Sequence, residues 1–196
     1  MKKRNAKIER TTKETSINLE LNIDGEGKYQ IDIPVGFLKH MLELFTKHGL
    51  FDLTIKASGD IEVDYHHTVE DIAICLGKAF RDSLGDMIGV KRYGFFILPM
   101  DESLAETAID ISSRPYLSYD VILPSGRIGD FDSELIREFF SKFVIHAGLT
   151  MHIKLSNCEN LHHGCEAIFK CVSKALCEAS RLDLRIKDAN TTKGIY

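Results

Sequence analysis

The chain has 196 residues, and its 25 basic and 29 acidic side chains give a formal net charge of −4 at pH 7. A chain of this length buries roughly 70% of the surface that it exposes when unfolded, which is enough for a hydrophobic core without disulfide or metal staples. Hydrophobic residues make up 44% and charged residues 28% of the sequence, so a disordered chain is excluded. The acidic balance argues against a nucleic-acid partner, and no apolar run reaches the roughly 18 residues that a membrane span requires.

The first half of the chain predicts two strands, a helix, a third strand and a second helix. The strands alternate apolar and polar side chains, and the helices carry apolar residues at the 3.6-residue spacing of an amphipathic helix. These elements are expected, in order, at residues 15–23, 29–33, 34–49, 51–55 and 68–84. Because only the turn at 24–27 separates the first two strands, we expect them to form a hairpin.

The second half predicts a similar order of strands and helices. Its strands are expected at 93–99, at 104–123 with a break near 112–115, and at 149–155, and its helices at 134–145 and 167–181. The same residues also recur in it. After a shift of 98 positions the matched pairs include His48 with His146 and Lys56 with Lys154, and after a two-residue deletion Cys75 with Cys171.

We interpret this recurrence as an internal duplication of a helix–strand–loop–helix unit. Two copies are too few for a solenoid, so we expect a single catalytic domain, residues 1–196, with halves at about 1–95 and 96–196 related by pseudo-twofold symmetry. The predicted fold class is α/β in composition and α+β in style. The five cysteines form no C-x-x-C pair and are odd in number, which is typical of reduced thiols and predicts a cytoplasmic protein.

Each half contains the pattern His-His-x-x-Glu where a loop enters a helix. The residues are His66, His67 and Glu70 in the first half, and His162, His163 and Glu166 in the second. Residues three or four apart share a helix face, so a histidine and the glutamate can bind one metal, while the adjacent histidine diverges by roughly 100° and can reach another. Imidazole with carboxylate suits Mn, Fe, Co, Ni or Zn. One such pattern alone is more often a pair of surface or core histidines, but its recurrence in the repeat favours metal binding.

The helix before each motif adds a candidate fourth ligand. His40 lies in the first half, and the 98-position shift places Glu138 at the corresponding place in the second. The sequence therefore predicts two sets of four ligands, which are His40, His66, His67 and Glu70, and Glu138, His162, His163 and Glu166.

The remaining histidines are expected to be structural. His48 and His146 lie at helix ends, where the helix dipole favours a protonated imidazole, and His152 is expected to pack in a strand or to support a ligand. Four cations are candidates for a phosphate cradle: Arg92, Arg114, Lys170 and Lys193. Each alone is more often a solvated surface charge, but Lys170 lies one helical turn after Glu166 and points toward the predicted metal.

At these residues the sequence resembles the imidazoleglycerol-phosphate dehydratase family of histidine biosynthesis. The matching segments are 10–15, 36–41, 66–71, 99–102, 162–170 and 192–194, and they run in order along nearly the whole chain. The resemblance implies a duplicated subunit like the ribosomal protein S5 domain 2-like fold. It also implies a homo-oligomeric shell of 24 copies, with active sites between subunits and two Mn²⁺ ions in each site.

The resemblance also implies the reaction, which is dehydration of imidazole glycerol phosphate to imidazole acetol phosphate. The route would pass through a metal-bound imidazolate and a diazafulvene-like intermediate. Glu14 would transfer protons, and His66, Glu70 and Glu166 would complete the catalytic set. The phosphate-binding residues would be Arg92, Arg114, Lys170, Lys193 and the hydroxyl of Thr192, with Glu14 also contacting the substrate.

Three residues depart from the family pattern. Lys39 and Tyr65 stand where aspartates are usual, which affects how the ligands are oriented, and Glu138 stands where many members have histidine. Two other functions use the same ligands. A binuclear metallohydrolase would activate water on a phosphoester or amide, and a metal-storage shell would bind metal without turnover. Storage needs neither the cations nor Glu14, so these residues favour an enzyme.

Overall fold

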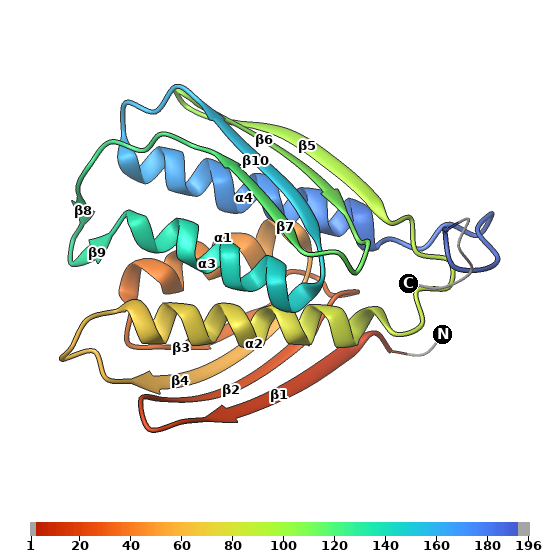
Figure 1. Cartoon of the computed structure of the whole chain (residues 1–196), viewed down its shortest axis with the longest axis horizontal. Helices are drawn as coiled ribbons and strands as arrows, with labels where there is room; N and C mark the ends of the chain where they lie inside the picture. Colours follow the sequence, from red (N-terminus) through yellow and green to blue (C-terminus); the bar gives the residue numbers. More distant parts are fainter. Residues whose placement is uncertain (1–2, 192–196) are drawn as a thin grey trace.

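Two four-stranded sheets enclose a layer of helices in the computed structural model, which describes residues 3–191 (Figure 1). The first sheet has the order β1-β2-β4-β3, formed by β1 (Asn5–Thr11), β2 (Thr15–Asn22), β3 (Tyr29–Asp32) and β4 (Asp52–Gly59). The second has the order β5-β6-β10-β7, formed by β5 (Tyr93–Met100), β6 (Ser103–Asp110), β7 (Tyr116–Asp120) and β10 (Thr150–Ser156). The helices between them are α1 (Gly36–Gly49), α2 (His66–Leu84), α3 (Glu134–Ala147) and α4 (Leu161–Ser180).

Both sheets have the same topology, which confirms the predicted α/β fold class with duplicated halves. In the first sheet β2 is antiparallel to β1 and β4, and β3 is parallel to β4. In the second sheet β6 is antiparallel to β5 and β10, and β7 is parallel to β10. The second sheet begins at Tyr93, so the division expected at 95/96 falls within β5.

The predicted hairpin between 15–23 and 29–33 is wrong. β2 pairs instead with β1, a strand that the sequence pattern did not reveal. β1 lies at the edge of the sheet, and its Ala6 and Ile8 are only half-buried. β3 instead lies on the far side of β4 and pairs with it in parallel, with α1 as the crossover between them. Parallel neighbours require such a crossover, so proximity in sequence did not decide the pairing.

The other boundaries differ by a few residues, and one difference matters for function. α2 begins at His66 and α4 at Leu161, so both histidine pairs lie in the first turn of a helix. The break predicted near 112–115 separates β6 from β7, and a short hairpin of β8 (Arg127–Ile128) and β9 (Phe131–Asp132) precedes α3. No helix among residues 3–191 is long and apolar enough to cross a membrane.

The helices of the two halves pack across the interface between them, α1 on α4 and α2 on α3 (Figure 1). Buried aromatic rings fill the space between the two halves, with centroid distances of 6.4 Å for Phe45 and Phe143 and 6.1 Å for Phe80 and Phe143. Gly77 lets α2 approach α3 closely, because a Cβ there would lie 2.6 Å from the carbonyl oxygen of Phe143. Neither half could bury these helix faces alone.

We expect Gly77→Ala to destabilise the protein although alanine normally favours a helix by about 1 kcal/mol. The added methyl group would collide with backbone, and overpacking of this kind costs about 1–3 kcal/mol. Urea unfolding of the metal-free variants, all at the same protein concentration, measures the change in the free energy of unfolding. Gly36→Ala is the matched control, because a Cβ at Gly36 meets nothing within 4 Å. Equal stability of the two variants would contradict the close approach.

Candidate metal centres

The histidine pairs occupy the first turns of α2 and α4, at the same end of the helix layer. At α4 the side chain of Asn160 caps the helix by accepting the backbone N–H of His162 at 2.9 Å and of His163 at 3.4 Å. At α2 the N-cap is Tyr65, one of the departures from the family pattern, and it makes no side-chain cap. Asp64 instead accepts the N–H of His66 at 2.7 Å.

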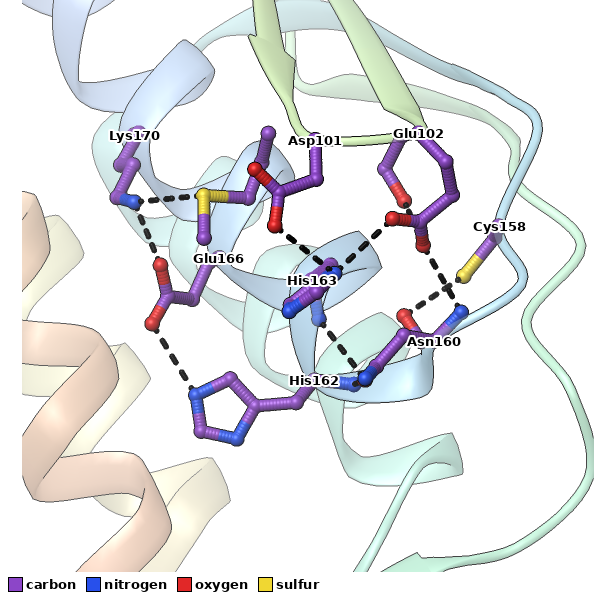
Figure 2. A network of polar contacts seen from close by, with 10 residues as sticks. Asp101, Glu102, Cys158, Asn160, His162, His163, Glu166 and Lys170 are labelled. Atoms are coloured by element: carbon purple, nitrogen blue, oxygen red, sulfur yellow. Dashed lines mark hydrogen bonds and ion pairs between the residues drawn. The ribbon is translucent and has the colours of Figure 1, made fainter.

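The first candidate metal centre consists of His40, His162 and Glu166. The Nε2 atoms of His40 and His162 lie 2.9 and 3.1 Å from the same carboxylate oxygen, Oε1 of Glu166. One ligand atom from each of the three side chains lies within 4.8 Å of the others. Figure 2 shows His162 and Glu166 on α4, with Lys170 on the opposite side of the carboxylate.

Positive charge keeps Glu166 ionised although it is almost fully buried. Burial alone would raise the pKa of Glu166, but hydrogen bonds with Lys170 and His40 and the charge of Lys170 outweigh it and lower the pKa to about 2. Lys170 donates to Oε2 of Glu166 at 2.5 Å and also contacts the sulfur of Met100. Glu166 is therefore a carboxylate at neutral pH, as a metal ligand must be.

The second candidate centre contains the carboxylates of Glu70 and Glu138, and the charge of His66 acts on Glu70. Lys142 on α3 bridges the carboxylates, with its Nζ atom 2.8 Å from Glu70 and 3.2 Å from Glu138. The hydrogen bond with Lys142 lowers the pKa of Glu70, and the charges of Lys142 and His66 lower it further, against the effect of burial. This centre presents two carboxylates where the first presents one carboxylate and a second imidazole.

Within one copy of the chain, the ligand candidates therefore come together across the two halves, and not in the two sets of four that the sequence spacing suggested. His40 lies beside the second-half motif, and Glu138 lies beside the first-half motif. The cause is the packing of α1 on α4 and of α3 on α2, which exchanges the helices between the halves. Glu138 does not contact His162 or Glu166 in any hydrogen bond or ion pair among the described residues.

The second histidine of each pair is held by a carboxylate that sequence reasoning missed. Asp60 lies 2.9 Å from Nδ1 of His67, and Glu102 lies 3.0 Å from Nδ1 of His163 (Figure 2). Each contact fixes the ring and leaves Nε2 for a metal, which is how carboxylates support metal-binding histidines. The only signal for Glu102 was its place in the matching segment 99–102, and Asp60 had none beyond the break after its strand.

These side chains fit a divalent transition metal. Two imidazoles and one carboxylate converge in the first centre, and the rings of His67 and His163 present Nε2 with the opposite nitrogen already hydrogen-bonded. Asp101, Glu102 and His163 also lie within 4.8 Å of one another, but there Glu102 uses its oxygens on His163, on Ser103 and on the N–H of Asn160. We assign that group to orienting His163.

The predicted phosphate-binding cations separate into two places. Arg92 and Arg114 both contact Asp110, at 2.6 and 3.5 Å, and line a cavity of about 490 Å³ with Tyr93 and residues 188–191. Lys170 lies instead beside the first metal centre. Thr192 and Lys193 lie outside the described residues, although the chain enters the Arg92 cavity at Thr191.

Glu14 lies in the turn between β1 and β2, close to the first-half histidine pair. Its backbone carbonyl accepts the N–H of Asp60 at 3.1 Å, and its carboxylate is exposed. The hydrogen bond with Asp60 raises the pKa of His67, and the charge of Glu14 adds to that effect, while burial opposes it. The turn thus places Glu14 beside a metal-ligand candidate.

The expectations for the other histidines require correction. Burial lowers the pKa of His48 and of His146, and lysines on the facing helices lower it further, so neither is held as a protonated cap. The helices end instead at Leu50 and Gly148 in the left-handed conformation, whose N–H groups bond back to the last turn. His152 is exposed on the outer face of β10, where it contacts only the ring of Tyr116 among described aromatic residues.

Comparison with known proteins identifies the family. The family model for imidazoleglycerol-phosphate dehydratase matches residues 33–176. The chain belongs to the imidazoleglycerol-phosphate dehydratase family. It is 56% identical to the imidazoleglycerol-phosphate dehydratase of Citrifermentans bemidjiense over 97% of this chain and 98% of that one. It is 51% identical to that of Shouchella clausii, over 98% of each chain.

Solved structures of the family share the fold. The structure of the Staphylococcus aureus enzyme superposes with a TM-score of 0.83 at 42% identity, over 91% of this chain and 99% of that one. The Pyrococcus furiosus enzyme, in complex with (S)-C348, gives a TM-score of 0.83 at 36% identity, over 96% and 100%. The predicted family and enzyme class, a hydro-lyase, are confirmed, and the family's reaction is a dehydration in histidine biosynthesis.

We expect the stability of the metal-free protein to fall as the pH decreases from about 4.5 to about 2, because Glu166 must be protonated there. A carboxyl group whose pKa is lowered by folding stabilises the protein above its unfolded pKa, and this contribution is lost as the pH falls through the folded pKa. The full shift is equivalent to about 3 kcal/mol. Urea unfolding at a series of pH values should show a shallower decline for Glu166→Gln. Glu134→Gln, at an exposed glutamate, is the control. A decline in Glu166→Gln as steep as in the wild type would refute this role.

Proposed function

We propose that this chain dehydrates imidazole glycerol phosphate to imidazole acetol phosphate in active sites that two or more copies of the chain build together. The observation that carries the proposal is the position of the two kinds of functional group. The histidine pairs lie in the first turns of α2 and α4, whereas Arg92, which lines the cavity shared with Arg114, is bonded to the last turns of α4.

The length of α4 sets that separation. His162 lies in its first turn, whereas the backbone N–H of Arg92 bonds to the carbonyl of Ala179 near its end. At 1.5 Å per residue these positions are about 25 Å apart along the helix. A substrate with one imidazole ring and a three-carbon phosphate is far shorter. One copy therefore cannot supply both the metal centre and the arginines to the same molecule, whereas neighbouring copies can.

The metal ions proposed for this site are two Mn²⁺. The residues that would hold them are His40, His66, His67, Glu70, Glu138, His162, His163 and Glu166. When bound, the ions would act as Lewis acids toward the imidazole ring and would favour its anionic form. Asp60 and Glu102 would keep the rings of His67 and His163 oriented for this purpose.

Glu14 would act as the general acid or base that transfers the proton in this reaction. The reaction removes the hydroxyl group from the carbon next to the ring and the hydrogen from the neighbouring carbinol carbon, and water leaves. The electron-rich ring would assist departure of the hydroxyl through a diazafulvene-like intermediate, and the enol then becomes the ketone. Glu14 is exposed beside His67, where it can transfer the proton, and a positioned acid or base contributes about 10²- to 10⁴-fold. Arg92, Arg114, Lys170, Lys193 and Thr192 would bind the phosphate.

The surface also supports assembly. The outer face of the first sheet is polar along β2, whereas β5 at the edge of the second exposes Tyr93, Phe95 and Ile97, at 56%, 74% and 57%. A contiguous exposed apolar strip of this kind marks an interaction site. We propose that copies of the chain cover it in a homo-oligomer, with 24 copies expected from the family resemblance. A biosynthetic enzyme whose five cysteines are free thiols is expected in the cytoplasm.

Mixing two inactive variants tests shared active sites. We expect His162→Ala to lose turnover through loss of metal, and Arg92→Ala to lose it through weaker phosphate binding. Mn-loaded oligomers reassembled from both variants together should regain activity, because some sites then receive an intact metal centre from one copy and an intact arginine from another. Formation of imidazole acetol phosphate from imidazole glycerol phosphate is the measurement.

The unmixed variants and the wild type are the controls. Mixed oligomers as inactive as their parents would refute shared sites, provided that both variants assemble. Release of inorganic phosphate by the wild type without the acetol phosphate would show a hydrolase and overturn the proposed reaction itself.

The exposed strip on β5 gives a separate expectation. Phe95→Glu should reduce the oligomer to smaller species in sedimentation velocity, because the carboxylate would be desolvated in a buried interface. Asn18→Glu, on the polar face of the first sheet, adds the same charge and should leave the assembly size unchanged. An unchanged size for Phe95→Glu would place the interface elsewhere.

A further inference from the structure

The duplication makes Glu14 and Glu102 equivalent in the fold. Glu14 directly precedes β2, and Glu102 directly precedes β6, the corresponding strand of the other sheet. Each strand is eight residues long and is followed in its sheet by the strand that leads to a His-His-x-x-Glu motif. Both glutamates therefore occupy the same place in the strand topology, one in each half.

The two carboxylates nevertheless have opposite environments. The oxygens of Glu102 accept hydrogen bonds from the ring of His163, from the N–H of Asn160 and from the hydroxyl of Ser103, at 3.0, 2.9 and 3.2 Å (Figure 2). The carboxylate of Glu14 has no hydrogen bond or ion pair within residues 3–191. One half uses its glutamate to hold a histidine, and the other leaves its glutamate without a partner.

Two aspartates of the first half account for this difference. The carboxylate of Asp60 forms a hydrogen bond with Nδ1 of His67 at 2.9 Å. In the other half, Glu102 forms the equivalent hydrogen bond with Nδ1 of His163. The hydroxyl of Thr15 donates a hydrogen bond to Asp71 at 2.5 Å, whereas the hydroxyl of the equivalent Ser103 donates to Glu102. Two of the three kinds of donor that hold Glu102, the histidine ring and the hydroxyl, are thus directed to other acceptors in the first half.

The same aspartates fix the turn that carries Glu14. The backbone N–H of Asp60 donates to the carbonyl of Glu14 at 3.1 Å. Asp71 is 5% exposed and forms an ion pair with Arg10 of β1 at 3.0 Å. Together with its hydrogen bond from Thr15, this ion pair fixes the end of β1 and the start of β2. The hydroxyl of Thr12 accepts the N–H groups of Glu14 and Thr15 and closes the turn.

We propose that Asp60 and Asp71 are positioning residues that keep the Glu14 carboxylate unpartnered and fixed beside the His67 ring. This proposal rests on the proposed function, because it assigns the free carboxylate to proton transfer. A carboxylate that already accepts two or three hydrogen bonds is a poor proton acceptor, so diverting those donors is what makes Glu14 suitable where Glu102 is not.

Replacement of Asp60 by alanine is the central test. In Asp60→Ala the Nδ1 atom of His67 loses its acceptor, and Glu14 should turn onto it as Glu102 does on His163. We expect kcat to fall about 10- to 100-fold while KM changes less than about twofold, because the phosphate-binding residues are untouched. Asp60→Asn retains an acceptor oxygen for Nδ1–H and should recover most of kcat. Glu62→Ala, at an exposed position of the same loop, removes the same charge and should behave as the wild type.

A double variant distinguishes this role from metal binding by His67. If Asp60 acts through Glu14, adding Asp60→Ala to Glu14→Gln costs no further activity in Mn-saturated enzyme. Additive losses, or a loss that follows the Mn content measured by elemental analysis, would overturn the proposal. If Asp60→Ala does not fold, Asp60→Ser, whose hydroxyl is too short to reach the ring, takes its place.

A crystal structure of Asp60→Ala gives a readout independent of turnover. A Glu14 carboxylate within hydrogen-bond distance of Nδ1 of His67 supports the proposal, and a carboxylate that stays free contradicts it. Hydrogen exchange of the amides at 12–15 should quicken in Asp71→Asn and remain unchanged in Asp82→Asn, an exposed aspartate of the same helix. These two measurements test the position of Glu14 and the order of its turn even if the wild type catalyses another reaction. Failure of the dehydration assay, by contrast, bears only on the proposed function.

Discussion

The packing of each half's first helix on the other half's second helix is the constraint on which the rest of the structure depends. α1 and α4, and α2 and α3, bury their apolar faces against each other, with the rings of Phe80 and Phe143 in contact between α2 and α3. Because these faces belong to different halves, the core forms only when both halves are present. The same contact brings His40 to Glu166 and Glu138 to Glu70, so the interface that stabilises the fold also assembles the metal-ligand candidates.

The two halves share a backbone plan but have diverged in their polar side chains. The first centre combines two imidazoles with one carboxylate, and the second combines two carboxylates with a bridging lysine. The second histidine is held by Asp60 at the end of β4 in one half and by Glu102 before β6 in the other. Duplication thus supplied equivalent places, and substitution at those places gave them different chemistry. Glu14 and Glu102 illustrate this most directly, since Glu102 accepts three hydrogen bonds whereas the carboxylate of Glu14 accepts none within residues 3–191.

The distribution of functional groups along the helix layer is the basis of the proposed assembly. The ligands lie at one end of α4 and the cavity of Arg92 and Arg114 lies at the other, about 25 Å away by the rise of an α-helix. A subunit with this arrangement is incomplete by itself for a substrate of the proposed size. The apolar strip on β5 provides a surface through which copies of the chain could meet. The proposed assembly and the proposed catalysis therefore rest on the same feature of the subunit, the separation of the ligand candidates from the arginines.

By itself the sequence determined the helices, most strands, the duplication, the ligand candidates and the family, because these depend on local periodicity and on residue spacing. The same locality explains its errors. It paired 15–23 with 29–33, and it did not reveal that His40 lies beside Glu166, because the sequence pattern depends only on which residues are near in the chain. Only the tertiary structure decided that α1 meets α4, that Asp60 and Glu102 hold the histidines, and that Arg92 lies far from Lys170. These outcomes depend on which apolar faces pack together across the pseudo-twofold relation, and that choice minimises exposed apolar surface over the whole chain.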